Sequence, residues 1–360
     1  MDRRLILGAA AAAPVAFATP ALAQANPEVR WRVQSSFPRV FDVLYGTLER
    51  IAARVAQLTD NRFRIQVFPA GEIVGGLQVL DAVQAGTIEG GHTASYYYIG
   101  KDIAFAPFTA MSFGLNFRQM TAWFRHGGGN QLANDLFREY NIHGITAGDT
   151  GAQMGGWFRN EIRSVSDLNG LKFRITGLAG QLFTRLGAAP TLIAPADIYP
   201  SLERGVIDAA EFVGPHDDER ANYVRVARFY YAPGFWEPGA RLHFMSNLRA
   251  WNALPDLYKH ALEVACAEAD SDMTSRYDHL NPQALRRLVA AGAQLRFWPR
   301  EVLQAAWNAN EALNADLARQ NPRFRTIMES YTAYRGEMYQ WHRVVENSFD
   351  NFAFSAAAAR

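Results

Sequence analysis

Two spacings of apolar residues run along the chain and predict alternating strands and helices. Residues 31–37 and 63–68 alternate apolar with polar side chains, which is typical of half-buried strands. Between them, residues 44–58 place apolar side chains at the three- and four-residue steps of an amphipathic helix. Residues 120–140 continue with helical spacing, which three consecutive glycines from Gly127 should interrupt. Strands that alternate with helices predict an α/β fold.

One phrase of the sequence occurs twice. Residues 81–89 read Asp-Ala-Val-Gln-Ala-Gly-Thr-Ile-Glu, and residues 199–208 read Tyr-Pro-Ser-Leu-Glu-Arg-Gly-Val-Ile-Asp. Each copy predicts a helix end, a glycine and then a strand that opens at Thr87 or Val206, because glycine adopts the left-handed conformation that follows many helices. Copies about 120 residues apart are too far apart for a solenoid and predict two similar lobes. Ligands bind beyond the carboxyl ends of strands in open α/β sheets, so facing lobes would enclose a cleft.

The chain is therefore expected to form two lobes with crossing segments between them. Glycine-rich residues 142–156 predict the first crossing, and the extended, aromatic segments 229–236 and 242–245 predict the return. After about Pro255 the pattern is helical except for one strand at 294–298. In the predicted layout, lobe 1 comprises residues 25–150 with about 241–280, lobe 2 comprises 151–240 with about 281–322, and 323–360 form a C-terminal helix.

The C-terminal helix carries apolar residues on one face. They recur at steps of three and four after Pro322, at Phe324, Ile327, Tyr331, Tyr334, Met338, Trp341, Val345 and Phe349. At ~1.5 Å per residue this helix is about 40 Å long. Its apolar face packs either on its own chain or on a second subunit. The aromatic content and the terminal position favour the second arrangement, a homodimer.

The N-terminus predicts export. Two arginines from Arg3, an alanine-rich apolar run at 5–18 and the small-residue pattern Ala-Leu-Ala before Gln24 indicate a secretory signal peptide over residues 1–24. The mature protein is accordingly expected in the periplasm. The paired arginines are compatible with twin-arginine export, and general secretion stays open. Since no other long apolar run follows, we expect the mature protein to be soluble.

Composition narrows the classes of function. The chain is 49% hydrophobic and 20% charged, which is enough for a sizeable core. Its net charge of +1 comes without a basic run, so nucleic acid is not an expected partner. A single cysteine, Cys266, leaves an exported chain without an internal disulfide, and its place on an apolar helical face indicates inert packing.

The sequence lacks the common catalytic motifs. It holds no Gly-x-Ser-x-Gly elbow, no His-Glu-x-x-His and no paired-cysteine zinc spacing. Three glycines after His126 are similar to an esterase oxyanion loop, but without a matching serine they indicate a helix interruption. His92, His216 and His243 lie near the expected cleft and are interpreted as core or rim residues. The chain is therefore expected to bind a ligand and not to be an enzyme.

Four polar residues stand at expected strand ends or crossings, among glycines and aromatic residues: Gln153, Arg174, Glu211 and Glu237. Arg174 alternates with two apolar neighbours, so its side chain leaves the strand on the face opposite theirs. Carboxylates in such apolar surroundings are costly unless they are paired or bound to a cation. Each residue alone is more readily a structural charge, but the set indicates a binding site.

Four segments of the chain resemble a known family. They are 148–158 (Gly-Asp-Thr-Gly-Ala-Gln-Met-Gly-Gly-Trp-Phe), 197–203 (Asp-Ile-Tyr-Pro-Ser-Leu-Glu), 211–215 (Glu-Phe-Val-Gly-Pro) and the pair Trp236-Glu237. Together they are similar to the extracytoplasmic solute-binding subunit of tripartite ATP-independent periplasmic (TRAP) transporters, in the branch that binds 2-oxoacids such as pyruvate with a metal ion. The resemblance covers nearly the whole chain. It implies a two-lobe α/β fold of the periplasmic-binding-protein type II kind and a transport role with membrane permease subunits.

The resemblance also implies roles in holding the substrate. The arginine that matches Arg174 grips the substrate carboxylate, and a tyrosine of the run 96–98, which we assign as Tyr98, helps to hold the substrate. Gln153 and Phe212 complete the implied substrate contacts. The family usually has tryptophan where this chain has Phe212, so the shape of the pocket and the substrate preference are expected to differ.

A metal site is implied beside the substrate. The residues matching Gln153, Glu211 and Glu237 supply metal oxygens, and the residue matching Phe212 adds a backbone carbonyl. Charge counting supports this site, because Arg174 (+1) and the two glutamates (−2) sum to −1, and a bound carboxylate makes −2. Two like charges about 4 Å apart repel by ~4 kcal/mol at an effective dielectric of about 20, so an anionic ligand needs a cation. Oxygen ligands suit Na⁺ or Ca²⁺, and the sequence leaves both open.

We therefore expect a periplasmic protein whose lobes close on a small 2-oxo or 2-hydroxy monocarboxylate, such as pyruvate, 2-oxobutyrate or lactate, and which delivers it to a permease. Closure is expected to complete the metal shell only when both lobes contribute. Three alternatives stay open. They are a binding protein for another organic anion without metal, a secreted hydrolase or lyase with Glu211 or Glu237 as general base, and a ligand-sensing partner of a membrane receptor.

Overall fold

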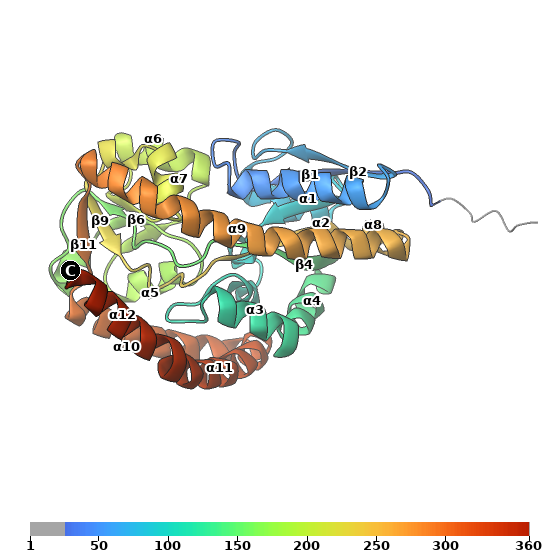
Figure 1. Cartoon of the computed structure of the whole chain (residues 1–360). Coiled ribbons are helices and arrows are strands. Elements are labelled where there is room, and N and C mark those ends of the chain that lie inside the picture. Colours follow the sequence, from blue (N-terminus) through green and yellow to red (C-terminus); the bar gives the residue numbers. More distant parts are fainter. Residues whose placement is uncertain (1–25, 360) are drawn as a thin grey trace, which may run out of the picture.

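The computed structural model describes residues 26–359, which Figure 1 draws in colour. The expected signal peptide at 1–24 lies outside these residues. Within 26–359, no helix combines the length and the apolar character that crossing a membrane requires. The described chain forms two α/β lobes, each built on one sheet, and long helices run past both (Figure 1).

Lobe 1 is built on a five-stranded sheet of order β2-β1-β3-β10-β4. β1 is parallel to β2 and β3, and β10 runs antiparallel between β3 and β4. Apolar residues alternate along β1 and β2 and pair across them, as Val33 does with Val67, which fixes the register of the buried face. The strands span β1 Val29–Ser35, β2 Phe63–Phe68, β3 Gly90–Thr93, β4 Ile142–Asp149 and β10 Arg241–Asn247.

Lobe 2 is built on a six-stranded sheet of order β11-β9-β5-β8-β6-β7. β6 is parallel to β7 and β8, with Arg174 opposite Ala210, so the carboxyl ends of β6 and β8 lie side by side. β5 is antiparallel to β8 and β9, and β9 is parallel to β11. The strands span β5 Trp157–Phe158, β6 Lys172–Arg174, β7 Ala189–Thr191, β8 Ala209–Ala210, β9 Phe229–Ala232 and β11 Gln294–Phe297.

Helices cover the sheets and connect the lobes (Figure 1). α9 serves both lobes, because its Glu268 pairs with Arg54 of α1 and its Arg287 pairs with Glu219 of α7. Cys266, also on α9, is fully buried in the lobe 1 core. The α-helices span α1 Leu44–Leu58, α2 Val79–Gln84, α3 Phe117–His126, α4 Gly129–Glu139, α5 Ala179–Arg185, α6 Ile198–Glu203, α7 Pro215–Arg220, α8 Leu248–Asn252, α9 Asp256–Ala290, α10 Arg300–Gln320, α11 Pro322–His342 and α12 Ser348–Ala358. Shorter turns span η1 Gly76–Gln78, η2 Ser95–Tyr98, η3 Ile103–Phe108, η4 Val165–Leu168, η5 Pro195–Asp197, η6 Tyr223–Arg225 and η7 Arg343–Asn347.

The repeated phrase forms the same local structure in each lobe. Gly86 and Gly205 follow α2 and α6 with φ of 73° and 70°, the left-handed conformation that the sequence predicts. The strand after each glycine begins three residues later than predicted, at Gly90 and Ala209. The reason is that the residues after the glycine fold back on the helix: Thr87 N donates to Ala82 O at 2.9 Å, and the corresponding residue of the second copy does the same.

Two crossing segments, 150–156 and 233–240, connect the lobes and run side by side. Gly234 N donates to Gln153 O at 2.8 Å, and Gln153 N donates to Glu237 O at 3.2 Å. The crossings are shorter than predicted, since residues 142–149 belong to β4 and residues 229–232 and 241–247 belong to β9 and β10. Gln153 and Glu237 thus stand opposite each other in the connection between the lobes.

The C-terminal helix divides into a covered part and an exposed part. In α11, Phe324 and Tyr331 are fully buried, and the Tyr331 hydroxyl accepts a hydrogen bond from Leu115 N at 2.7 Å. Further along, Phe349 and Phe352 of α12 are 67% and 76% exposed. α11 therefore packs on its own chain, whereas α12 presents unpaired aromatic side chains as it runs back past α10 (Figure 1).

Candidate functional site

Five of the candidate residues meet where the crossing segments pass the carboxyl ends of β6 and β8. Arg174 is the last residue of β6, Glu211 and Phe212 directly follow β8, and Gln153 and Glu237 come from the two crossings. All five side chains are buried, and the three charged ones are at most 1% exposed. Parallel neighbouring strands bring their carboxyl ends to one edge of the sheet, which is why residues so distant in sequence converge here.

Arg174 and Glu211 form a buried ion pair. Arg174 Nη1 donates to both the backbone oxygen and Oε1 of Glu211, each at 2.6 Å, and its Nε donates to Ile193 O at 3.1 Å. Among the described residues, Arg174 Nη2 has no hydrogen-bond partner. A buried guanidinium N–H without an acceptor is costly, so Nη2 is a donor available to an anionic ligand.

Thr176 stands between the two glutamates. Its hydroxyl lies 2.8 Å from Glu237 Oε1 and 3.1 Å from Glu211 Oε1, and a single hydroxyl proton serves only one of them. Burial, followed by the neighbouring charge of Glu211, raises the pKa of Glu237 well above its usual value. Burial also raises the pKa of Glu211, although the charge of Arg174 opposes this. Two carboxylates in this position need either a proton or a cation.

Three buried oxygens in this group fit a hard cation. Within the described part of the chain, Gln153 Oε1, Glu211 Oε2 and Glu237 Oε2 have no hydrogen-bond donor. The Gln153 amide nitrogen donates to Thr150 Oγ1 at 3.0 Å, which identifies Oε1 as the atom left for a ligand. Because all three atoms are oxygens and two belong to carboxylates, the set suits Na⁺ or Ca²⁺ better than a transition metal.

Lobe 1 closes over this group and leaves a small cavity. The cavity has a volume of about 10 Å³, close to the space that one water molecule needs. An organic acid therefore needs the lobes to part before it enters. The lining comes from lobe 1 (Phe37, Leu44, Tyr96, Tyr97, Leu242), from lobe 2 (Arg174, Phe212, Val213) and from the crossings (Thr150, Gln153, Ala240).

The choice of Tyr98 needs correction. Tyr98 does not line the cavity: its hydroxyl lies 2.8 Å from Thr93 Oγ1 and accepts a hydrogen bond from Leu80 N at 3.2 Å, inside lobe 1. Tyr96 and Tyr97 line the cavity instead. The three tyrosines form the 3₁₀ turn η2, in which three residues make one turn, so consecutive side chains point in different directions.

The four candidate metal ligands all lie outside lobe 1. Gln153 and Glu237 lie on the crossings, and Glu211 and Phe212 lie on lobe 2. None of these four residues belongs to a helix or strand of lobe 1, whose contribution to the cavity is apolar and aromatic. In this structure the candidate ligands therefore come from lobe 2 and the crossings, and lobe 1 contributes apolar and aromatic side chains to the cavity beside them.

Sequence reasoning missed Thr176, whereas its interpretation of the three histidines as core or rim residues fits their burial. Thr176 follows Arg174, the last residue of β6, by two residues, and the period of two of an extended chain, continued past the strand end, would have placed both side chains on one face. His92 and His243 are buried in the sheet of lobe 1, as expected of core residues. His216 is also buried, and its ring contacts Asp42 of the other lobe at 2.8 Å.

Comparison with known proteins identifies a family of proteins and relatives with similar sequences. Residues 38–321 match the family model described as bacterial extracellular solute-binding protein, family 7. A relative from Nostoc sp. (strain PCC 7120), named a monocarboxylate 2-oxoacid-binding periplasmic protein, is 46% identical over 364 residues, which cover 99% of this chain and 100% of the relative.

Two solved structures share the fold and much of the sequence. A TRAP transporter solute-binding protein from Bordetella bronchiseptica RB50 has a TM-score of 0.91 and 46% identity, and the match covers 93% of this chain and 99% of that one. That structure is a mixed-occupancy dimer, in which one active site holds co-purified calcium and picolinate and the other is apo. A TRAP periplasmic solute-binding protein from Pseudoalteromonas atlantica T6c, with bound sodium and pyruvate, has a TM-score of 0.87 and 35% identity over 89% of this chain and 98% of that one. The expected two-lobe α/β fold is confirmed.

Proposed function

Because the chain belongs to the family 7 bacterial extracellular solute-binding proteins, which serve TRAP transporters, we propose that it captures a small 2-oxo or 2-hydroxy monocarboxylate together with Na⁺ or Ca²⁺. The observation that carries this proposal is the set of three buried oxygens, together with Arg174 Nη2, that have no hydrogen-bond partner among residues 26–359. Cation ligands and a carboxylate donor lie side by side, as a chelating 2-oxoacid requires. The relatives that hold sodium with pyruvate, or calcium with picolinate, support the same pairing.

Arg174 would bind the carboxylate of the acid. Within the described part of the chain, Nη2 is the one guanidinium nitrogen of Arg174 without a partner, because Glu211 holds Nη1 and Ile193 O accepts from Nε. Two parallel hydrogen bonds to the acid would require the Glu211 side chain to turn away from Nη1 and toward the cation. When bound, the cation supplies the positive charge that balances the two glutamates and the acid. Glu211 would thus change partners as the acid arrives, which couples the acid and the cation.

The two lobes have different roles in the proposed binding of the acid. Lobe 1 (25–150 with about 241–280) covers the acid with Tyr96 and Tyr97. Lobe 2 (151–240 with about 281–322), which within these bounds includes nearly all of both crossings, holds its charges. The protein would act in the periplasm after removal of residues 1–24 and deliver the acid to the membrane subunits of its transporter.

A thermal-shift screen tests the proposed ligand class. Pyruvate, 2-oxobutyrate and lactate should each raise the melting temperature by a few degrees in the presence of Na⁺ or Ca²⁺, because they bind only the folded state. Succinate and gluconate, which bring a second carboxylate or a longer polar chain to a site with a single arginine donor, should give smaller shifts. Stabilisation by succinate alone, or an equal shift in cation-free buffer, would instead support a metal-free anion site.

The acid recovered after binding separates transport from catalysis. We expect pyruvate released from the denatured complex to be chemically unchanged. Conversion of the acid, abolished by Glu211→Gln or Glu237→Gln, would favour the hydrolase or lyase alternative.

We further propose that α12 forms part of a homodimer interface. Phe349, Phe352 and Phe354 are each at least 67% exposed, an unusual display of aromatic surface for a monomer. The double variant Phe349→Ser/Phe352→Ser should halve the molecular mass measured by light scattering after size-exclusion chromatography. Val264→Ser, which removes a 54% exposed apolar side chain from α9, is the matched control and should leave the mass unchanged. A dimer that survives the double substitution would refute this interface.

A further inference from the structure

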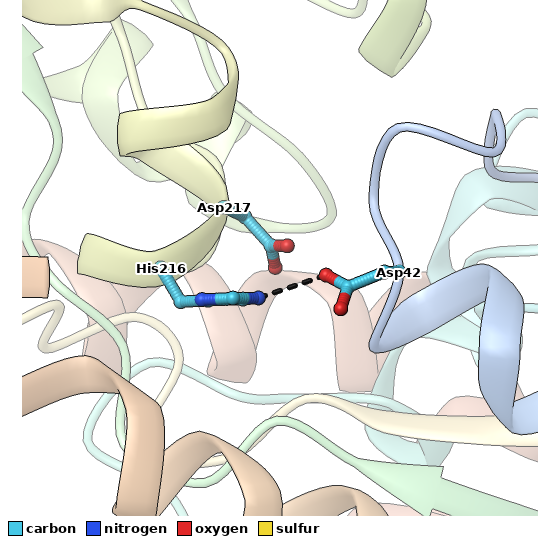
Figure 2. Close-up of side chains that lie close together, drawn as sticks. All are labelled: Asp42, His216 and Asp217. Carbon is cyan, nitrogen blue, oxygen red and sulfur yellow. Dashed lines mark hydrogen bonds and ion pairs between the residues drawn. The ribbon is translucent and has the colours of Figure 1, made fainter.

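A group of polar contacts joins the two lobes outside the cavity. Asp42 lies in lobe 1, directly before the residue that caps α1. Its carboxylate contacts His216 Nε2 at 2.8 Å and Arg220 Nε at 3.0 Å, both on α7 of lobe 2, and Arg276 Nη2 of α9 at 3.4 Å. Figure 2 shows Asp42 reaching toward α7 from its own loop, with its carboxylate directed at the His216 ring. We call Asp42 with these three partners the Asp42 clasp.

We propose that the Asp42 clasp holds the lobes in the closed arrangement and thereby tightens acid binding, an inference that for its second half rests on the proposed function. Asp42 is a positioning residue in this view, because it touches neither the cavity nor the candidate ligands. Its partners are separated from it by 174 to 234 residues, so opening the cleft would break its contacts with α7.

The clasp is connected to the cavity through its neighbour in sequence. Phe41 packs its ring on that of Phe212 at a centroid distance of 4.6 Å, and Phe212 in turn lies over the Arg174 guanidinium at 5.9 Å. Phe41 therefore closes the apolar side of the cleft while Asp42 makes the polar contacts beside it. One short segment of lobe 1 thus makes both kinds of contact with lobe 2 near the candidate site.

The residue types around Asp42 are those of a metal site, but the net charge of the group disfavours a metal ion. Ligand atoms of Asp42, His216 and Asp217 lie within 4.8 Å of one another (Figure 2). Burial raises the pKa of Asp217 to about 8, so this carboxyl largely keeps its proton at neutral pH. Two guanidinium groups, Arg220 and Arg276, outweigh the single charge of Asp42. A divalent cation would be repelled from a group that is already positive.

The groups around Asp42 favour its ionised form. Although burial opposes it, the hydrogen bond from His216 and the charge of Arg220 hold the pKa of Asp42 below its usual value. The side chain is 39% exposed, so each contact is individually modest. The two contacts with α7, which form together on closure, are expected to shift the closing equilibrium about tenfold and the apparent affinity for the acid by up to the same factor.

The test compares Asp42→Asn with a matched ion-pair variant. By calorimetry with pyruvate in Na⁺ or Ca²⁺ buffer, Asp42→Asn should weaken affinity about tenfold, and stopped-flow measurements should place the loss in faster dissociation. The control Asp272→Asn removes a carboxylate that pairs with Arg50 at 2.9 Å between α1 and α9, and it should stay within twofold of wild type. An unchanged Asp42→Asn affinity, or an equal loss in both variants, would overturn the clasp.

Solution scattering tests the clasp without any acid. Asp42→Asn should show a larger radius of gyration than wild type in ligand-free buffer, and Asp272→Asn should not. If wild type binds none of the acids, the proposed function fails, and the scattering result alone decides whether the clasp exists. If Zn²⁺ makes wild type more compact and has no effect on Asp42→Asn, the group is a metal site and the clasp is refuted.

Discussion

Arg174→Ala should abolish acid binding that calorimetry can detect. The substitution removes the buried donor that faces the cavity, and it also leaves Glu211 buried without its ion-pair partner. Two like charges about 4 Å apart repel by ~4 kcal/mol at an effective dielectric of about 20, so an acid that enters beside two uncompensated glutamates meets added repulsion. Together these effects predict a loss of at least about 1000-fold in affinity.

Two further variants show whether the loss concerns the acid or the fold. Arg174→Lys keeps the positive charge but not the planar fork, so it should bind the acid about 10- to 100-fold more weakly than wild type. Arg163→Ala removes an arginine whose side chain is 80% exposed in the same lobe, and it should bind like wild type. Thermal unfolding of each variant confirms that it is folded at the temperature of the titration. Micromolar affinity retained by folded Arg174→Ala would contradict the assigned role.

Much of the fold could be predicted because the spacing of apolar residues was clear. The helix at Leu44–Leu58 and the strand at Phe63–Phe68 have the predicted bounds, since each has an unbroken pattern that is followed by turn residues, Thr59-Asp60-Asn61 and Pro69-Ala70-Gly71. Strand starts after a helix were less predictable. After Gly86 and Gly205 the backbone first donates hydrogen bonds to the preceding helix, and the spacing of apolar side chains does not indicate this.

The candidate site could be predicted only in part. Polar residues among glycines and aromatic residues pointed to Arg174 and Glu211, and the structure brings them together. Which tyrosine faces the cavity depends on the phase of a single 3₁₀ turn, and three identical residues give no clue to it. Asp42 carried no signal at all, because its nearest partner, His216, is 174 residues away and meets it only when the lobes close.

Removal of the cation should weaken acid binding about 100-fold. The experiment dialyses the protein against a calcium chelator, replaces Na⁺ with a large organic cation, and then measures pyruvate affinity by calorimetry. Without a cation, the oxygens of Gln153, Glu211 and Glu237 that have no hydrogen-bond partner among the described residues stay unsatisfied, and Glu237, whose pKa is raised well above its usual value, must keep a proton for the acid to bind beside it. Restoring either Na⁺ or Ca²⁺ should recover the affinity, and the ion that does so at the lower concentration is the one the site prefers.

Glu237→Gln tests whether acid binding needs the cation for its charge or for its coordination geometry. The amide keeps the shape and one oxygen of the side chain, but it removes one charge, so Arg174 and Glu211 alone sum to zero. An acid then brings the group only to −1, and the need for a cation is smaller. We therefore expect weaker cation binding in this variant together with a cation dependence of acid affinity that falls from about 100-fold to about tenfold or less. Cation dependence that stays at the wild-type value would mean that the ion is needed for its coordination geometry, and that the balance of charge does not govern this site.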